Sequence, residues 1–344
     1  MRQGDGDSEH PGEVPSFRKS EWKTIMKTHR YVAAAVVLLL AGVEAHAARC
    51  LFVSSYHRGY AWSDGVERGL RSVLEGRCEL RQFDMDTKRH KDEESKRHAA
   101  EEAHRLIQSW KPDVVITADD NAAKYLIVPY YRDASLPVVF SGVNWTAQEY
   151  GFPFSNVTGM VEVAPIRPML EAALQTVGNG GPAFYLGADT LTERKNLARF
   201  EAAARDIGLI LDSRLVGTAD EWIKAHAEVQ DTHAFLVLGS YSGIKDWDER
   251  QESVREAVLK QSRRLSVTNH GWMMPFAMLG MTKIPEEQGE WSAQAALAIL
   301  DGARPNEIPI IANRQWDVWV NESLLHVSGL ALPEDLRRKA KTMD

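Results

Sequence analysis

A repeated alternation of short apolar segments with longer amphipathic segments most strongly constrains what this chain can fold into. Residues 51–55 form a short apolar run that ends in serine, and Val66, Leu70 and Leu74 then recur at helical spacing. Ser63 or Asp64 is the expected N-cap of that helix. An alternation of strand, helix and strand predicts a parallel sheet with helices on both of its faces.

The same pattern continues along the chain and restarts after Pro165, so two α/β halves follow each other. The predicted strands are 51–55, 79–84, 111–117, 136–141 and 156–160, followed by 183–186, 209–216, 234–239, 265–268 and 309–311. The predicted helices are 65–74, 99–107, 122–127, 169–177, 197–207, 222–229, 249–261 and 290–300. A length of 344 residues is enough for two domains with cores of their own.

The first 47 residues read as a segment that is not part of the fold. Residues 27–30 are basic, residues 31–43 are apolar, and Ala45-His46-Ala47 fits a small-x-small cleavage site, which together predict a secretory signal peptide over 26–47. Residues 1–25 are then an upstream extension, expected to be disordered. A retained N-terminal anchor is the alternative. Cleavage predicts a mature chain beginning near Ala48 and located in the periplasm.

Export bears on the two cysteines of the chain. Cys50 and Cys78 each stand at the start of a predicted strand, and the first two strands of a doubly wound sheet are neighbours. The pair can therefore form a disulfide in an oxidising compartment. Two buried free thiols are the alternative, because bridge geometry cannot be read from sequence.

Composition and motifs argue against nucleic-acid binding and against the common enzyme classes. A net charge of −7 supplies no basic surface for nucleic acid. The chain has no nucleophile elbow, no phosphate-binding loop, no His-Glu-x-x-His motif and no cysteine cluster. His90 and His98 fit a solvated helix face better than a metal site. We therefore predict no catalytic residue, no metal and no cofactor.

Five loops follow predicted strands, at the edge where open α/β sheets bind ligands. Aromatic side chains there can stack on a planar or apolar group, and Asp119, Asp120 and Asn144 can hold a cationic or amide group. Trp272 fits a hydrophobic core equally well, because Met273 and Met274 follow it. The predicted ligand-binding residues are Ser55, Tyr56, His57, Tyr60, Trp62, Asp119, Asp120, Asn121, Asn144, Trp145, Ser240, Tyr241, Asn269 and Trp272.

An ordered set of motifs gives the chain a resemblance to a known family. The set comprises Ser54-Ser-Tyr-His57 with Tyr60 and Trp62-Ser63, Lys111-Pro-Asp-Val-Val-Ile-Thr-Ala118, Pro137-Val-Val-Phe-Ser-Gly-Val143, Asn156-Val-Thr-Gly-Met160, Ile299-Leu-Asp-Gly302 and Gly329-Leu-Ala-Leu-Pro333. Through most of the mature chain, the sequence resembles the periplasmic substrate-binding proteins of ABC transporters, in the family that includes tryptophan/tyrosine-type binding proteins.

The resemblance implies a type I periplasmic-binding fold, with two doubly wound parallel-sheet lobes joined by a hinge. Lobe 1 is expected at 48–163 with a return segment at about 275–344, and lobe 2 at 164–274. The implied function is capture of a small organic ligand for an ABC permease by a monomer. The alternative is a ligand-sensing subunit that partners a membrane sensor kinase or cyclase.

One position departs from the family. Its amino-acid binders tend to carry Thr-Asp after the Gly-Val of the fourth-strand loop, where this chain has Asn144-Trp145. The missing acidic residue weighs against an amino-acid ligand.

Overall fold

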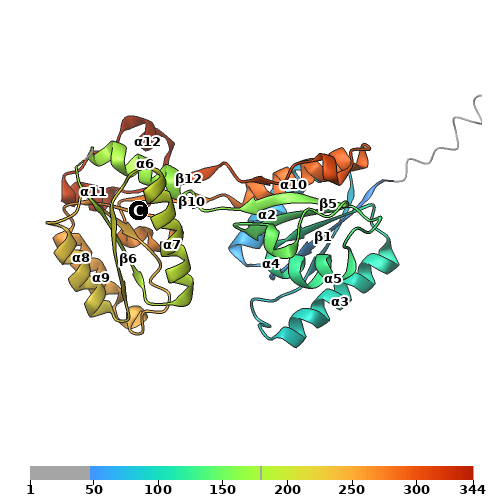
Figure 1. Cartoon of the computed structure of the whole chain (residues 1–344), viewed down its shortest axis with the longest axis horizontal. Coiled ribbons are helices and arrows are strands. Elements are labelled where there is room, and N and C mark those ends of the chain that lie inside the picture. The colour runs from blue at the N-terminus through green and yellow to red at the C-terminus, as the bar shows by residue number, and fades with distance from the viewer. Residues whose placement is uncertain (1–46, 179, 344) are drawn as a thin grey trace, which may run out of the picture. The chain divides into compact units, whose positions relative to one another are not determined.

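A computed structural model describes residues 47–178 and 180–343, which fold around two β-sheets (Figure 1). The first sheet has six strands in the order β11-β5-β4-β3-β1-β2, and every neighbouring pair is parallel. Its strands are β1 (Arg49–Ser54), β2 (Glu79–Asp84), β3 (Val114–Ala118), β4 (Val138–Asn144), β5 (Val157–Glu162) and β11 (Ile311–Ala312). The predicted α/β class with parallel sheets is confirmed.

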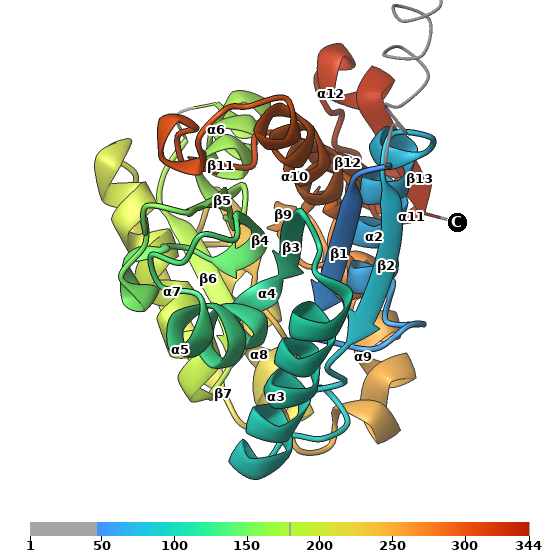
Figure 2. The same ribbon diagram turned by 90° about the vertical axis from the view of Figure 1, so that its right-hand side faces the viewer.

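Helices cover both faces of the first sheet (Figure 2), which is why its central strands are apolar along their whole length. Phe52 and Ile116 pack with α2 and α10, whereas Leu51 and Val115 pack on the opposite face with α3 and the segment from α4 to α5. The helical elements are α2 (Ala61–Leu74), α3 (Glu93–Trp110), α4 (Asp119–Ala122), the π-helix η1 (Ala123–Ile127), α5 (Val128–Tyr130), η2 (Gln148–Tyr150), α10 (Pro285–Leu300) and η4 (Pro305–Glu307).

Glycines allow α2 and α10 to pack backbone against backbone. A Cβ atom on Gly69 would collide with the carbonyl of Glu286, and a Cβ atom on Gly289 would collide with the carbonyl of Val66. Each helix thus carries a glycine where the other approaches it most closely. This contact fixes a helix from late in the chain onto the first sheet.

The second sheet has seven strands in the order β13-β12-β10-β9-β8-β6-β7, with β10 and β12 antiparallel and the other pairs parallel. Its strands are β6 (Ala183–Ala188), β7 (Leu211–Val216), β8 (Phe235–Leu238), β9 (Leu265–Thr268), β10 (Leu279–Lys283), β12 (Trp316–Asn321) and β13 (Ala340–Met343). Its helices are α6 (Ile166–Val177), α7 (Leu191–Asp206), α8 (Ala219–Val229), α9 (Trp247–Gln261), η3 (Gly271–Phe276), α11 (Glu322–Ser328) and α12 (Glu334–Lys339).

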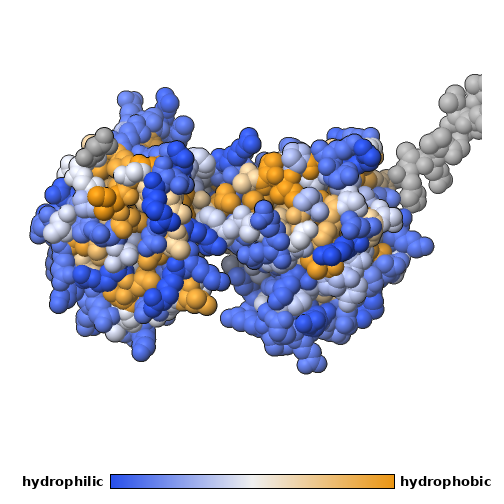
Figure 3. All heavy atoms as spheres, in the orientation of Figure 1, coloured by the Kyte–Doolittle hydropathy of each residue, from blue (hydrophilic) through white to orange (hydrophobic). Residues whose placement is uncertain are grey.

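Aromatic side chains dominate the core around the second sheet. Trp222, Trp247 and Phe276 are fully or almost fully buried and pack edge to face on one another. Hydrophilic residues cover most of the face shown in Figure 3, with apolar patches between them. Among the described residues, no helix combines the length and apolar character that crossing a bilayer requires.

The chain crosses between the two sheets three times: after β5, after β10 and after β11. The expected return segment at about 275–344 is therefore only partly correct. Its α10 and β11 join the first sheet, but β10, β12 and β13 extend the second. Strand β12 pairs antiparallel with β10, and β13 pairs with β12 at the edge of the sheet; none of these three strands was predicted from the sequence.

Two local predictions have clear outcomes. Cys50 and Cys78 form a disulfide, with their Cα atoms 6.0 Å apart, because the register places β1 beside β2. The N-cap prediction is wrong: α2 is capped at Tyr60 without a side-chain hydrogen bond, and Ser63 is buried inside the helix. The predicted upstream extension and signal peptide lie outside the described residues, except for Ala47.

Candidate functional site

Ser55 holds together the loops at the carboxyl ends of β1 and β3. Its buried hydroxyl donates to the Ala118 carbonyl at 2.5 Å and accepts from the Ala122 N–H at 2.8 Å. The Ser55 carbonyl accepts from both the backbone N–H and the hydroxyl of Thr87. With both roles of its hydroxyl occupied, Ser55 positions the neighbouring side chains.

Tyr56 and Tyr60 form a half-buried aromatic pair beside a lysine. Their rings meet edge to face with centroids 5.2 Å apart, and the Lys88 Nζ atom lies 4.3 Å from the Tyr56 centroid and 5.0 Å from that of Tyr60. His57 lies next to them, with its Nδ1 atom 3.0 Å from the Arg58 carbonyl oxygen. The Tyr pair thus already binds one ammonium group over its rings.

Asp119 is a buried carboxylate without a hydrogen-bond partner for its Oδ2 atom among the described residues. Only 3% of the residue is exposed, and its backbone is left-handed with φ +69°. Burial raises the pKa of this carboxyl group well above its usual value, and the charges of Glu162 and Asp120 raise it further, while the Lys88 ammonium and hydrogen bonding from the nearby Trp62 side chain lower it. An ionised carboxylate in these surroundings is only partly compensated.

Asp120, the next residue, is fully bonded. It accepts from the Asn144 side chain at 2.5 Å, from the Asn144 backbone N–H and from the Tyr150 hydroxyl at 2.8 Å. Asn121 donates to the Thr87 hydroxyl at 2.8 Å. These bonds tie the segment after β3 to those after β2 and β4.

Glu162 at the end of β5 and Lys283 at the end of β10 form an ion pair that joins the two sheets. Glu162 is buried, and burial raises its pKa while the Lys283 ammonium acts in the opposite direction. The Lys283 Nζ atom also lies 5.3 Å from the centroid of the Trp62 ring. The pair brings a charge from the second sheet to the carboxyl edge of the first.

These side chains share one neighbourhood. The pKa of the Tyr56 hydroxyl is raised first by burial and then by the charges of Asp119, Asp120, Tyr60 and Glu162, so all three carboxylates act on Tyr56 electrostatically. We call Asp119, Asp120 and Glu162 the carboxylate cluster. The described residues contain no group of three His, Cys, Asp or Glu side chains arranged to hold a metal ion.

The predicted residues of the second lobe have mixed surroundings. Ser240 is held by its N–H to Glu193, and its hydroxyl accepts from the half-exposed Trp272 at 3.3 Å. Tyr241 stacks on Trp247 with centroids 4.7 Å apart and so belongs to the aromatic core. The Oδ1 atom of Asn269 is buried without a hydrogen-bond partner in the described part of the chain.

Trp145 links elements of both lobes. It follows β4 with φ +63°, and the Arg199 guanidinium of α7 lies 3.9 Å from its ring centroid. The ring also packs against the core of the second sheet. Trp145 is therefore a contact between lobes as well as a predicted ligand residue.

Sequence reasoning missed three residues of this neighbourhood: Lys88, Glu162 and Lys283. Glu162 and Lys283 each end a strand, at the same edge as the residues that were predicted. A charged residue directly after a buried apolar run is the signal that could have identified Glu162. Lys283 carried no such signal, because β10 itself was not predicted.

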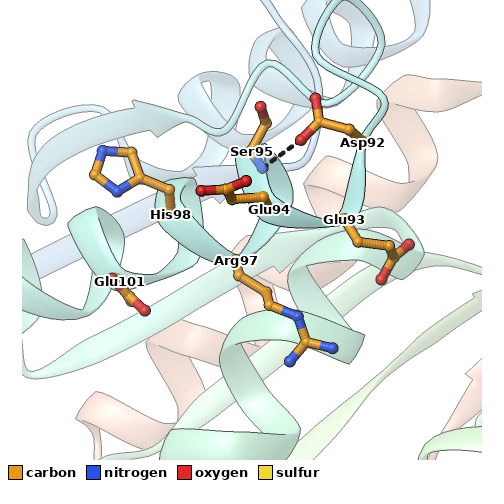
Figure 4. A pocket seen from close by; sticks show the side chains of 7 residues that line it. All are labelled: Asp92, Glu93, Glu94, Ser95, Arg97, His98 and Glu101. Atoms are coloured by element: carbon orange, nitrogen blue, oxygen red, sulfur yellow. Dashed lines mark hydrogen bonds between the residues drawn. The ribbon is translucent and has the colours of Figure 1, made fainter.

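A separate surface pocket is outlined by residues at the start of α3 (Figure 4). The described residues that line it are Asp92, Glu93, Glu94, Ser95, Arg97, His98 and Glu101. Asp92 accepts from the Ser95 N–H at 2.8 Å as the helix cap. All seven come from one helix and its cap, and this pocket shares no residue with the carboxylate cluster.

Comparisons with solved structures place this geometry in a known fold. The chain is similar to a ligand-free, open structure of CD0873, a substrate-binding protein with adhesive properties from Clostridium difficile, with TM-score 0.70, 13% identity and coverage of 86% of this chain and 99% of that one. It is also similar to an ABC domain in complex with L-Trp from Streptococcus pneumonia, with TM-score 0.53, 13% identity and coverage of 86% and 99%.

A periplasmic ribose ABC transporter protein from Conexibacter woesei matches with TM-score 0.53 and 13% identity, over 83% of this chain and 96% of that one. No protein-family model matches the sequence, and no curated protein does. At these identities the likeness establishes the fold alone. The chain has the type I periplasmic-binding fold.

Proposed function

We propose that this chain is an exported solute-binding protein that captures a small organic ligand between its lobes and delivers it to an ABC permease. The observation that carries the proposal is the convergence of side chains from the ends of β1, β3, β4 and β5 with Lys283 of the second sheet. Ligand sites of open α/β sheets lie at this edge. The fold and its substrate-binding neighbours support the same assignment.

The role is binding without chemical conversion. Asp119 and Asp120 have different surroundings, and no base is positioned next to a nucleophile among the residues of the carboxylate cluster and its neighbours. A ligand that co-purifies with the protein should be recovered chemically unchanged. Conversion of that ligand on incubation would contradict the proposal.

Trp62→Ala tests the proposed site. Trp62 is half-buried beside Lys283 and Asp119, so its removal should weaken binding of any compound found in a thermal-shift screen by about tenfold or more, the scale of an aromatic anchor. The melting temperature of the empty protein should change little. Trp319→Ala, at a half-buried tryptophan on β12, is the control and should bind normally.

The proposed partner is tested by genomic context and transport. A permease and an ATPase encoded next to this chain, with uptake that depends on it, are expected. A neighbouring sensor kinase or cyclase that responds to the ligand would instead favour a sensing role for the same site.

A further inference from the structure

We infer that the ligand of this site is a small organic cation whose N–H group pairs with the Asp119 carboxylate. The inference rests on the proposed function and specifies the chemical class of its ligand. It depends on the contrast between Asp119 and every other carboxylate of the cluster.

The first argument is hydrogen bonding. Asp120 accepts three hydrogen bonds and Glu162 has Lys283. The Oδ2 atom of Asp119 meets no donor in hydrogen-bond geometry among the described residues, although the residue is 97% buried and the nearby Trp62 indole N–H is unpaired there as well. The Asp119 side chain lies over Gly142, where a Cβ atom would come within 3.1 Å of Oδ1. A buried carboxylate with a free acceptor costs stability, so the fold alone gives no reason for it.

The second argument is charge balance. The carboxylate cluster contains three acids, and Lys88 and Lys283 are the two ammonium groups whose charges act on it. With all three acids ionised, one negative charge is left over. A monocation supplies the missing charge, whereas an anionic ligand would make the imbalance worse.

The third argument is the character of the walls. The rings of Tyr56 and Tyr60 already accommodate the Lys88 ammonium, and Trp62 accommodates that of Lys283. Aromatic rings at these distances attract cations through their electron-rich faces. The aromatic rings near Asp119 are therefore of a kind that attracts ammonium groups.

The protonation of Asp119 agrees with this. Burial has the largest effect on the pKa of Asp119 and raises it. The charges of Glu162 on β5 and Asp120 on α4 raise it further, while the Lys88 ammonium after β2 and hydrogen bonding from Trp62 on α2 lower it. The empty site thus favours the neutral acid. When a cation binds, the carboxyl proton leaves to solvent and the carboxylate pairs with the ligand, so binding is coupled to proton release.

The test is a panel of small probes of different charge, measured by thermal shift and isothermal titration. Benzylamine and butylamine should bind, choline should bind more weakly because it has no N–H group, and benzoate, succinate and ribose should bind least. Asp119→Asn should weaken binding of the amines by about 10- to 100-fold, the value of a charged hydrogen bond. Lys88→Met should strengthen it, because it removes a competing cation.

Asp113→Asn is the matched control. Asp113 stands directly before β3 and Asp119 directly after it, so the two lie at opposite ends of the strand. The Asp113 carboxylate accepts from the Arg49 N–H at 2.8 Å. Amine binding by this variant should equal that of the wild type. If Asp119→Asn does not fold, titrating the wild type with benzylamine in phosphate and in HEPES gives a second measurement, since coupled proton release makes the heat depend on the buffer.

Tighter binding of benzoate, succinate or ribose than of the amines would overturn the inference and leave the proposed function standing. Amine binding that is unchanged in Asp119→Asn, or independent of the buffer, would also overturn it. If no amine binds, the inference fails, and the response to the remaining probes then decides whether the proposed function fails with it.

Discussion

Asp119 and Asp120 are neighbours in the sequence, yet their carboxylates have different roles. Asp120 is occupied by Asn144 and Tyr150 and ties two loops together. Asp119 points into the buried side of the same turn and keeps an open acceptor. A left-handed backbone at Asp119 separates the two side chains, and aspartate is one of the few residues that adopt this conformation at low cost.

His226 gives a prediction about pH. It is fully buried on α8, stacks on Trp222, and burial lowers its pKa to about 4 from an ordinary value of 6.5. The unfolded chain therefore takes up a proton between these pH values while the folded protein does not. The contribution of His226 to the free energy of unfolding is fully present above about pH 6.5. It falls as the pH drops towards 4, and at pH 5 it is lower by about 2 kcal/mol.

Urea denaturation at pH 7 and pH 5 measures this contribution. Between the two pH values, the free energy of unfolding of His226→Gln should fall by about 2 kcal/mol less than that of the wild type, whatever the stability of the variant at pH 7. His98→Gln, at an exposed position on α3, should behave as the wild type. Equal losses in wild type and His226→Gln would show that His226 titrates normally in the folded protein.

At this scale the sequence predicted where polar residues gather but not which of them share contacts. Tyr56, Asp119 and Asn144 follow predicted strands, and the structure brings them to one edge. Tyr241 also follows a strand, but it stacks on Trp247 in the core. The direction of a side chain after a strand depends on loop geometry, which residue type alone does not specify.

Among the contacts between elements, the one between α2 and α10 leaves the least room for a larger side chain. Gly289→Ala should reduce the free energy of unfolding by about 1–3 kcal/mol, because its methyl group meets the Val66 carbonyl rather than a movable side chain. The gain in helix propensity from alanine, up to about 1 kcal/mol, offsets only part of this loss. Urea denaturation measures this change in the free energy of unfolding.

Gly217→Ala is the control for this variant. Gly217 has an ordinary φ and only the Glu221 carboxylate 3.8 Å from a Cβ position, so the substitution should be neutral within about 0.5 kcal/mol. A stabilising effect of Gly289→Ala would mean that the helices are farther apart than described.

The disulfide connects two neighbouring strands across a separation of 28 residues. Its loss in a Cys50→Ala/Cys78→Ala double variant should cost about 3–4 kcal/mol in the chain-entropy account, because the unfolded chain regains the freedom of that loop. Denaturation with and without dithiothreitol should reproduce the difference for the wild type. Two reactive thiols in the unreduced denatured protein would show that the bridge is absent.

Most strands of the two sheets were predictable because each is a short apolar run between turn residues. The predicted strand at 79–84 coincides with β2, whereas β10, β12 and β13 were not predicted. These three strands lie on the side of the second sheet that contains its antiparallel pair. Their pairing is decided by long-range contacts that a local pattern does not carry.

At the scale of the whole molecule, the crossings between the sheets are bonded to one another. The Asn313 side chain accepts from the Val163 N–H at 2.7 Å and donates to its carbonyl at 3.1 Å, so the crossing after β11 holds the one after β5. The Glu287 carboxylate accepts from the N–H groups of Arg314 and Gln315. The connectors therefore form one bonded unit.

Asn313→Ala should lower the free energy of unfolding by about 1–3 kcal/mol, because it leaves the backbone N–H and the carbonyl of Val163 without their partner. Hydrogen exchange at the Val163 amide should accelerate at the same time. Asn306→Ala, at an exposed asparagine in η4, should change neither quantity. Unchanged exchange at Val163 in the Asn313 variant would contradict the bonded arrangement of the crossings.

Three passages of the chain between the sheets also mean that neither lobe is a continuous stretch of sequence. A fragment ending at residue 163 would lack α10 and β11, and the surface of β3 and β4 that α10 covers would be open to water. A protease that nicks one connector would leave both halves tethered by the other two. The lobes are thus inseparable by simple dissection, and each can be studied only within the intact chain.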